Sequence, residues 1–159
     1  MRRLLLIVAA IALICAILGC DSTESNVEAD AELGSWDFSR PITLTRTAVA
    51  VGVSAAPATI SVSDGTLVLS TATSTTDVST AATGSARLEM TVGEQTWVFS
   101  GNYTRNGNEI WATDLAPGTA TEGYADLTLT LSSARTMTGK LQYQDADSNY
   151  YNGTCLLDK

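Results

Sequence analysis

The sequence predicts an all-β fold, an antiparallel meander of eight to ten strands that closes into an up-and-down barrel. From Gly34 onward the chain is rich in Thr, Ser, Val, Ala and Leu, with glycines between the runs, which is typical of strands and turns. Apolar residues alternate along these runs, and successive hairpin registers agree with one another. The barrel is favoured because closure leaves no unpaired edge, and a two-sheet β-sandwich is the alternative.

Two expected runs of opposite parity open the β domain. Pro41 interrupts the first run. Two apolar residues before it, Trp36 and Phe38, and two after it, Ile42 and Leu44, share one parity. The second run contains Val49, Val51 and Val53. The change of parity requires a turn or a bulge near residues 45–47.

Asp64-Gly65 is the first hairpin signal, because both central residues of a type I′ turn need positive φ. A two-residue tip there brings four aliphatic residues together as opposed pairs on one face: Val62 with Leu67, and Ile60 with Leu69. Residues 71–84 are rich in Ser, Thr and Ala and have little to bury. We expect them to form a ragged edge strand or a long loop.

The next two turns share a strand whose pairing must satisfy both of them. With tips at residues 93–94 and 106–107, both registers agree and predict these opposed pairs: Met90 and Trp97, Leu88 and Phe99, Ala86 and Gly101, Tyr103 and Ile110, Gly101 and Ala112. Ala86, Gly101 and Ala112 then form a row of small residues. The row either floors a small-ligand cavity or makes room for Trp36, and we favour the second.

Trp111 falls on the outward parity beside Asn102. There it is a candidate contact for a ligand or a partner. Alternatively it is covered by the loop expected at Asp114–Glu122, which we favour.

Three C-terminal strands complete the meander. Links at residues 133–135 and 145–149 predict these opposed pairs: Leu131 and Met137, Leu129 and Gly139, Leu127 and Leu141, Tyr143 and Tyr151, Leu141 and Gly153, Gly139 and Cys155, Met137 and Leu157. Cys155 is expected to be a small core residue. Residues 145–149 match the start of an EF-hand loop, but Tyr150 and Leu156 stand where its glycine and glutamate belong, so we expect a turn built from Asx residues rather than a calcium site.

Composition excludes several function classes. The formal charge is −8, and loss of the two arginines in residues 1–19 takes it to −10, so nucleic acid is not an expected partner. The chain has no histidine, and Glu89, Glu109 and Asp126 have outward parity, which leaves no buried carboxylate pair and no activated nucleophile. We predict no catalytic residue, no metal site, no cofactor and no enzymatic activity.

The first twenty residues, MRRLLLIVAAIALICAILGC, predict export. Arg2 and Arg3 precede an apolar run that is shorter than the roughly 20 residues needed to span a bilayer. Residues 17–20, Ile-Leu-Gly-Cys, resemble the lipobox of bacterial lipoproteins, which implies a cleaved signal peptide over residues 1–19 and a lipid on Cys20. Ordinary signal-peptidase cleavage or an uncleaved anchor is the alternative.

The lipobox resemblance also defines the expected domains. Residues 20–33 would form the lipidated end and an acidic tether, and residues 34–159 the β-barrel domain. The lipid on Cys20 would anchor this domain to a membrane of the bacterial cell envelope, outside the cytoplasm.

Gly34-Ser35-Trp36, at the start of the first expected strand, is similar to the G-x-W motif of the lipocalin and avidin-like barrels, the calycins. The resemblance implies that Trp36 closes one end of the barrel under a basic residue from the last strands. Arg135 and Lys140 are the candidates. No ligand-binding residue is carried over by this motif.

Two functions agree with these features. The first is a non-enzymatic envelope lipoprotein whose β domain is a structural or protein-interaction module with an envelope protein as its partner. The second is a lipocalin-like carrier that holds a small apolar ligand inside the barrel. We favour the first, because several aromatic rings would fill the volume that a ligand needs: Trp97, Phe99, Tyr103, Tyr143 and Tyr151.

Overall fold

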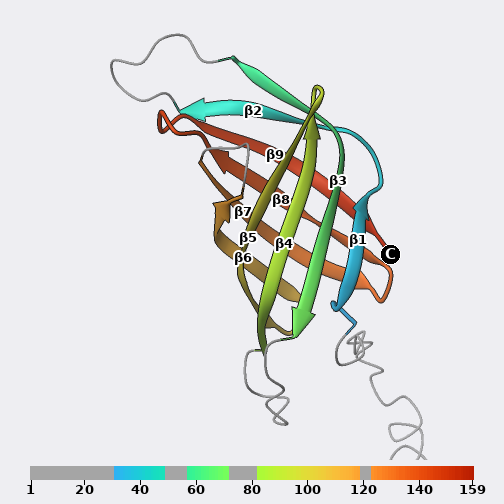
Figure 1. The fold of residues 1–159 in the computed structure, drawn as a ribbon. Coiled ribbons are helices and arrows are strands. Elements are labelled where there is room, and N and C mark those ends of the chain that lie inside the picture. Colours follow the sequence, from blue (N-terminus) through green and yellow to red (C-terminus); the bar gives the residue numbers. More distant parts are fainter. Residues whose placement is uncertain (1–30, 49–56, 72–81, 119–122) are drawn as a thin grey trace, which may run out of the picture.

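A computed structural model describes residues 31–48, 57–71, 82–118 and 123–159 (Figure 1). These residues form nine strands: β1 (Gly34–Phe38), β2 (Ile42–Ala48), β3 (Thr59–Thr71), β4 (Ala82–Val92), β5 (Gln95–Asn106), β6 (Glu109–Pro117), β7 (Tyr124–Ser133), β8 (Thr136–Gln144) and β9 (Tyr150–Asp158). Over these ranges there is no helix of the length and apolarity that crossing a membrane requires. The predicted signal peptide and Cys20 lie outside the described residues.

The nine strands belong to one antiparallel sheet that closes on itself. Strands β3 to β9 pair in sequence order, each with the next. Strands β1 and β2 both lie between β3 and β9, where β1 pairs with residues 66–69 of β3 and β2 pairs with residues 59–62. The two short strands therefore share one of eight positions around the barrel (Figure 1). The predicted up-and-down barrel is confirmed, and the sandwich alternative is wrong.

The predicted hairpin at Asp64-Gly65 is also wrong, because β3 continues through these residues. A bulge against β4 follows Val62 and reverses the parity, so the residues on both sides of it still face the core: Ile60, Val62, Leu67 and Leu69. The backbone N–H of Gly65 donates to Asp64 Oδ1 at 2.8 Å. Gly65 is needed for space, since a Cβ there would lie 2.5 Å from the ring of Phe38.

Strand β2 carries the irregularity expected near residues 45–47, because its pairing with β9 shifts between Arg46 and Ala48. Val49, Val51 and Val53 lie outside the described residues. So does most of the segment at residues 71–84, although its two ends, Thr71 and Gly84, pair with each other.

Strands β4 and β5 pair as predicted across the tip at residues 93–94. The β5–β6 tip lies at residues 107–108 rather than 106–107, so Tyr103 faces Ala112 instead of Ile110. Gly93 and Gly107, the first residues of the two tips, both have a φ of 60°. A type II′ turn requires such a glycine at its first central position, which explains the shift.

Strand β6 continues to Pro117, so residues 114–117 are not the start of the loop predicted at Asp114–Glu122. The register with β7 shifts between Ala112 and Leu115, and Asp114 within this shift has a φ of 53°. As a result, Leu115 points into the core and is fully buried.

Strands β7, β8 and β9 pair in the predicted registers, for example Leu129 with Gly139 and Tyr143 with Tyr151. Apolar side chains from all nine strands fill the barrel. The largest fully buried ones are Trp36, Tyr103, Tyr151 and Phe99. Cys155 belongs to this core, as predicted.

Trp36 closes one end of the barrel, which we call the base. Its Nε1 donates a hydrogen bond to the carbonyl oxygen of Glu32 at 2.7 Å, and Nζ of Lys159 lies 5.2 Å from the ring centroid. The basic residue over the tryptophan is therefore Lys159, which follows β9. The expectation of Arg135 or Lys140 is wrong, because the cation over the ring comes from Lys159.

Residues 31–33, which the sequence assigns to the acidic tether, pack against the base. Ala31 and Leu33 contact the core, and Glu32 is 1% exposed rather than solvated. Arg105 of β5 pairs with the Glu32 carboxylate and donates from Nε to the carbonyl oxygen of Gly107 at 2.7 Å. The ion pair thus joins the incoming chain to the β5–β6 hairpin.

We expect Leu129→Asp to unfold the barrel, and Thr128→Asp to change the free energy of unfolding by no more than about 0.5 kcal/mol. Leu129 is buried, whereas Thr128 is exposed on the outer face. An unpaired charge in an apolar core is strongly unfavourable. Urea unfolding followed by tryptophan fluorescence measures the effect, and equal midpoints for the two variants would contradict the register.

Arg105→Met should lower the free energy of unfolding by about 3–5 kcal/mol, because it leaves the buried Glu32 carboxylate without its partner. Arg87→Met is the matched control. Arg87 pairs with Glu89 on the surface, where the side chains are 51% and 35% exposed, so we expect a change within about 1 kcal/mol. If both variants lower the free energy of unfolding by the same small amount, the Arg105–Glu32 ion pair does not hold residues 31–33 at the base.

Candidate functional site

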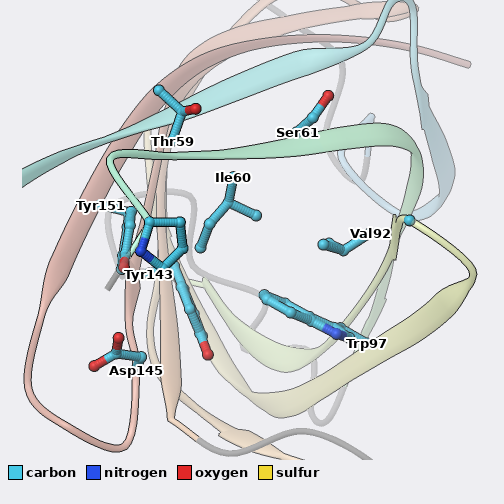
Figure 2. A pocket seen from close by; sticks show the side chains of 10 residues that line it. Thr59, Ile60, Ser61, Val92, Trp97, Tyr143, Asp145 and Tyr151 are labelled. Carbon is cyan, nitrogen blue, oxygen red and sulfur yellow. The ribbon is translucent and has the colours of Figure 1, made fainter. Parts of the chain in front are cut away.

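The end of the barrel away from the base, which we call the mouth, holds a cavity of about 450 Å³. The start of β3, the β4–β5 turn and the β8–β9 turn surround it (Figure 2). Its lining, named the cup from here on, consists of Pro57, Thr59, Ile60, Ser61, Val92, Gly93, Trp97, Tyr143, Asp145 and Tyr151. A volume of this size is within the range of small-molecule sites.

Three aromatic rings form a row along the cup. The ring centroids of Trp97 and Tyr143 are 5.1 Å apart with an interplanar angle of 41°, and those of Tyr143 and Tyr151 are 5.9 Å apart at 31°. Phe99 supports the row by an edge contact with Tyr143, at 5.9 Å and 66°. Figure 2 shows Val92 on the same side as Trp97 and Ile60 between Trp97 and Tyr151, so the cup is mainly apolar.

Asp145 is the charged residue of the cup, and the β8–β9 turn fixes its carboxylate. Asn149 donates to it from the backbone N–H to Oδ1 at 2.8 Å, and from Nδ2 to both oxygens, at 2.9 Å to Oδ2 and 3.2 Å to Oδ1. The backbone N–H of Ser148, which has a φ of 63°, donates to the carbonyl oxygen of Asp145 at 3.0 Å. This is the turn of Asx residues that the sequence predicts.

Charges around the cup act on Tyr151. Burial raises the pKa of Tyr151, and the negative charge of Asp145 raises it further, whereas Arg46 on β2 opposes the shift. Tyr151 therefore stays a neutral phenol at physiological pH.

The small-residue row does not form a cavity floor. Ala86 faces Gly101 as predicted, but a register shift separates Gly101 from Ala112. A Cβ at Gly101 would lie 2.9 Å from Leu115 Cδ2, so Gly101 makes room for Leu115 and not for Trp36. All three row residues lie outside the cup.

Trp111 is half-buried on the outer face of β6, between Thr104 of β5 and Thr128 of β7. The expected cover by residues 114–117 is absent, because these residues extend the strand. Trp111 lines neither the cup nor the outer hollow described next. Its role as a ligand or partner contact stays a prediction.

The outer face has a smaller hollow of about 250 Å³ lined by Asp114, Tyr124, Asp126, Gln142, Tyr143, Gln144 and Tyr150. Tyr124 and Tyr150 lie on either side of Gln144 in neighbouring strands. In the described ranges they are the large apolar side chains most open to solvent, at 52% and 45%.

Two further features limit the chemistry of the described residues. Burial raises the pKa of Cys155 to about 12, so its thiol stays protonated and poorly nucleophilic. Within the described ranges, no three His, Cys, Asp or Glu side chains lie close enough to hold a metal ion.

The sequence reasoning placed Trp97, Tyr143 and Tyr151 correctly on the inward face but missed the cup. One signal was available. Each of these aromatic residues lies within three residues of a predicted turn, at 93–94 or 145–149. In a meander those two turns lie at the same end, so inward residues beside them must meet at one mouth.

Comparisons with known proteins show the fold and no family. No family model matches the chain, and no curated protein matches it. Among solved structures, EF1p2_mFAP2b bound to DFHBI is similar, with a TM-score of 0.57 and 12% identity over 82% of this chain and 94% of that one. A redesigned β-barrel has a TM-score of 0.48 and 14% identity over 82% of this chain and 92% of that one.

Proposed function

We propose that this protein is a lipid-anchored, non-enzymatic β-barrel of the bacterial envelope that binds a small, mainly apolar molecule in its cup. The cup carries the proposal, because a cavity of about 450 Å³ with an aromatic wall is the usual form of a small-molecule site. The likeness in fold to EF1p2_mFAP2b, which is bound to DFHBI, supports it.

The site differs in position from that of the carrier expected from the sequence. Below the cup the barrel is filled by the buried side chains of Phe99, Tyr103, Leu88 and Leu127. A ligand would therefore sit at the mouth, in contact with Trp97 and the β4–β5 and β8–β9 turns, rather than deep inside. Such a shallow site suits capture and release more than long-term storage, because little of the barrel must open.

The interaction module is the second candidate function, and the exposed tyrosines favour it. Tyr124 and Tyr150 lie together on the outer face, where aromatic side chains are typical anchors for a protein partner. We rank it second, because the hollow of about 250 Å³ beside them is small and four of its seven lining residues are carboxylates or amides.

The proposed binding site predicts that the full-length protein binds the neutral fluorescent probe N-phenylnaphthylamine. Val92→Trp should weaken this binding at least about tenfold, because the larger ring fills the cup. Thr128→Trp, which adds the same side chain on the outer face, should leave the affinity unchanged. Fluorescence titration measures all three proteins, and either no binding by the native chain or equal binding by both variants would contradict the site.

The proposed anchor predicts that Cys20→Ser abolishes incorporation of an alkynyl fatty acid into the protein expressed in a bacterial host. Cys15→Ser is the matched control and should retain the label, because Cys15 would be removed with the signal peptide. Gel fluorescence after click labelling measures both. Persistent labelling of Cys20→Ser would refute the anchor.

A further inference from the structure

The charge that lines the cup is negative. Of its ten lining residues, Asp145 carries a charge and the others are apolar, aromatic, hydroxylic or glycine, with no lysine or arginine among them. The second acidic residue of the same turn, Asp147, is exposed nearby. Arg46 lies on the neighbouring strand opposite Tyr151 and does not line the cup. A ligand in the cup therefore meets a carboxylate, not a cation.

The Asp145 carboxylate keeps room for a ligand. A carboxylate has about four acceptor positions, and Asn149 fills three of them here: its backbone N–H donates to Oδ1, and its Nδ2 donates to both oxygens. Because these donors belong to the turn, the carboxylate is held in place before any ligand arrives. A donor from a ligand can take the fourth position without rearrangement of the turn.

The aromatic row also favours a positively charged ligand. The faces of indole and phenol rings attract cations, and Trp97 at the half-buried end of the row binds them best of the three. Tyr143 and Tyr151 continue the row toward Asp145 (Figure 2). An apolar body with a terminal ammonium could thus contact Trp97 and Tyr143 while its charge approaches the carboxylate.

From this juxtaposition of a fixed carboxylate with an aromatic row, we infer that the cup selects organic cations, amines with an apolar or aromatic body, and rejects fatty acids and other organic anions. The inference rests on the proposed ligand-binding function and adds the chemical class. The acidic character of the whole chain, with a formal charge of −8, acts in the same direction by attracting cations toward the mouth.

Three probes with one ring system test the inference: naphthylmethylamine, naphthylmethanol and naphthylacetate. Calorimetric titration of the full-length protein at neutral pH should give an affinity for the amine at least about tenfold above that for the alcohol, with the acetate weakest. Val92→Trp should weaken the amine and the alcohol alike, which assigns both to the cup.

Asp145→Asn should lower the amine affinity to that of the alcohol and leave the alcohol within about twofold, because an amide keeps an acceptor for Asn149 but loses the charge. Asp147→Asn is the matched control and should retain the preference for the amine.

Equal affinity of the native protein for the amine and the alcohol would overturn the cation class but would leave the proposed ligand site unaffected. Binding of none of the probes, together with no binding of N-phenylnaphthylamine, would instead remove the proposed function itself. If Asp145→Asn does not fold, the comparison of amine with alcohol on the native chain still decides.

Discussion

Closure of the sheet depends on how β3 pairs along both of its edges. One edge follows β4, while the other changes partner from β2 at residues 59–62 to β1 at residues 66–69. The bulge after Val62 makes this change while keeping the apolar residues on both sides of it inward, and Gly65 leaves space for the Phe38 ring beside it. Without this bend, β3 could not complete the ring, and the sheet would keep two unpaired edges.

The two ends of the closed barrel differ in how their charges are satisfied. At the base, Arg105 neutralises the buried Glu32, and Lys159 lies over Trp36, so this end is sealed by side chains that hold one another. At the mouth, the Asp145 carboxylate accepts hydrogen bonds from the neutral donors of Asn149, and no lysine or arginine lines the cup beside it. The carboxylate that faces the cup is therefore oriented by neutral groups, which is why we propose the mouth, and not the base, as the end that receives a ligand.

The sequence predicted the C-terminal half of the fold well because its signals are local and strong. The links at residues 133–135 and 145–149 are short, and a register error of one residue would expose every leucine of β7. The Asp64-Gly65 pair misled because the same two residues suit a turn or a bulge, and the choice came from the pairing of β3 with β4, which continues on both sides of them. Leu115 was missed for a similar reason, since a shift of the β6–β7 register turned it inward.

The sequence by itself determined that this is an all-β meander and which side chains in most of its strands face inward, because alternation along a strand is set by the backbone over a few residues. It also supplied the cup residues Trp97, Tyr143 and Tyr151 as inward aromatics. Only the tertiary structure decided that they meet Asp145 at one mouth, and that Lys159 rather than Arg135 or Lys140 covers Trp36. Those meetings depend on where the ring of strands closes, and closure is fixed by pairings between residues far apart in the chain.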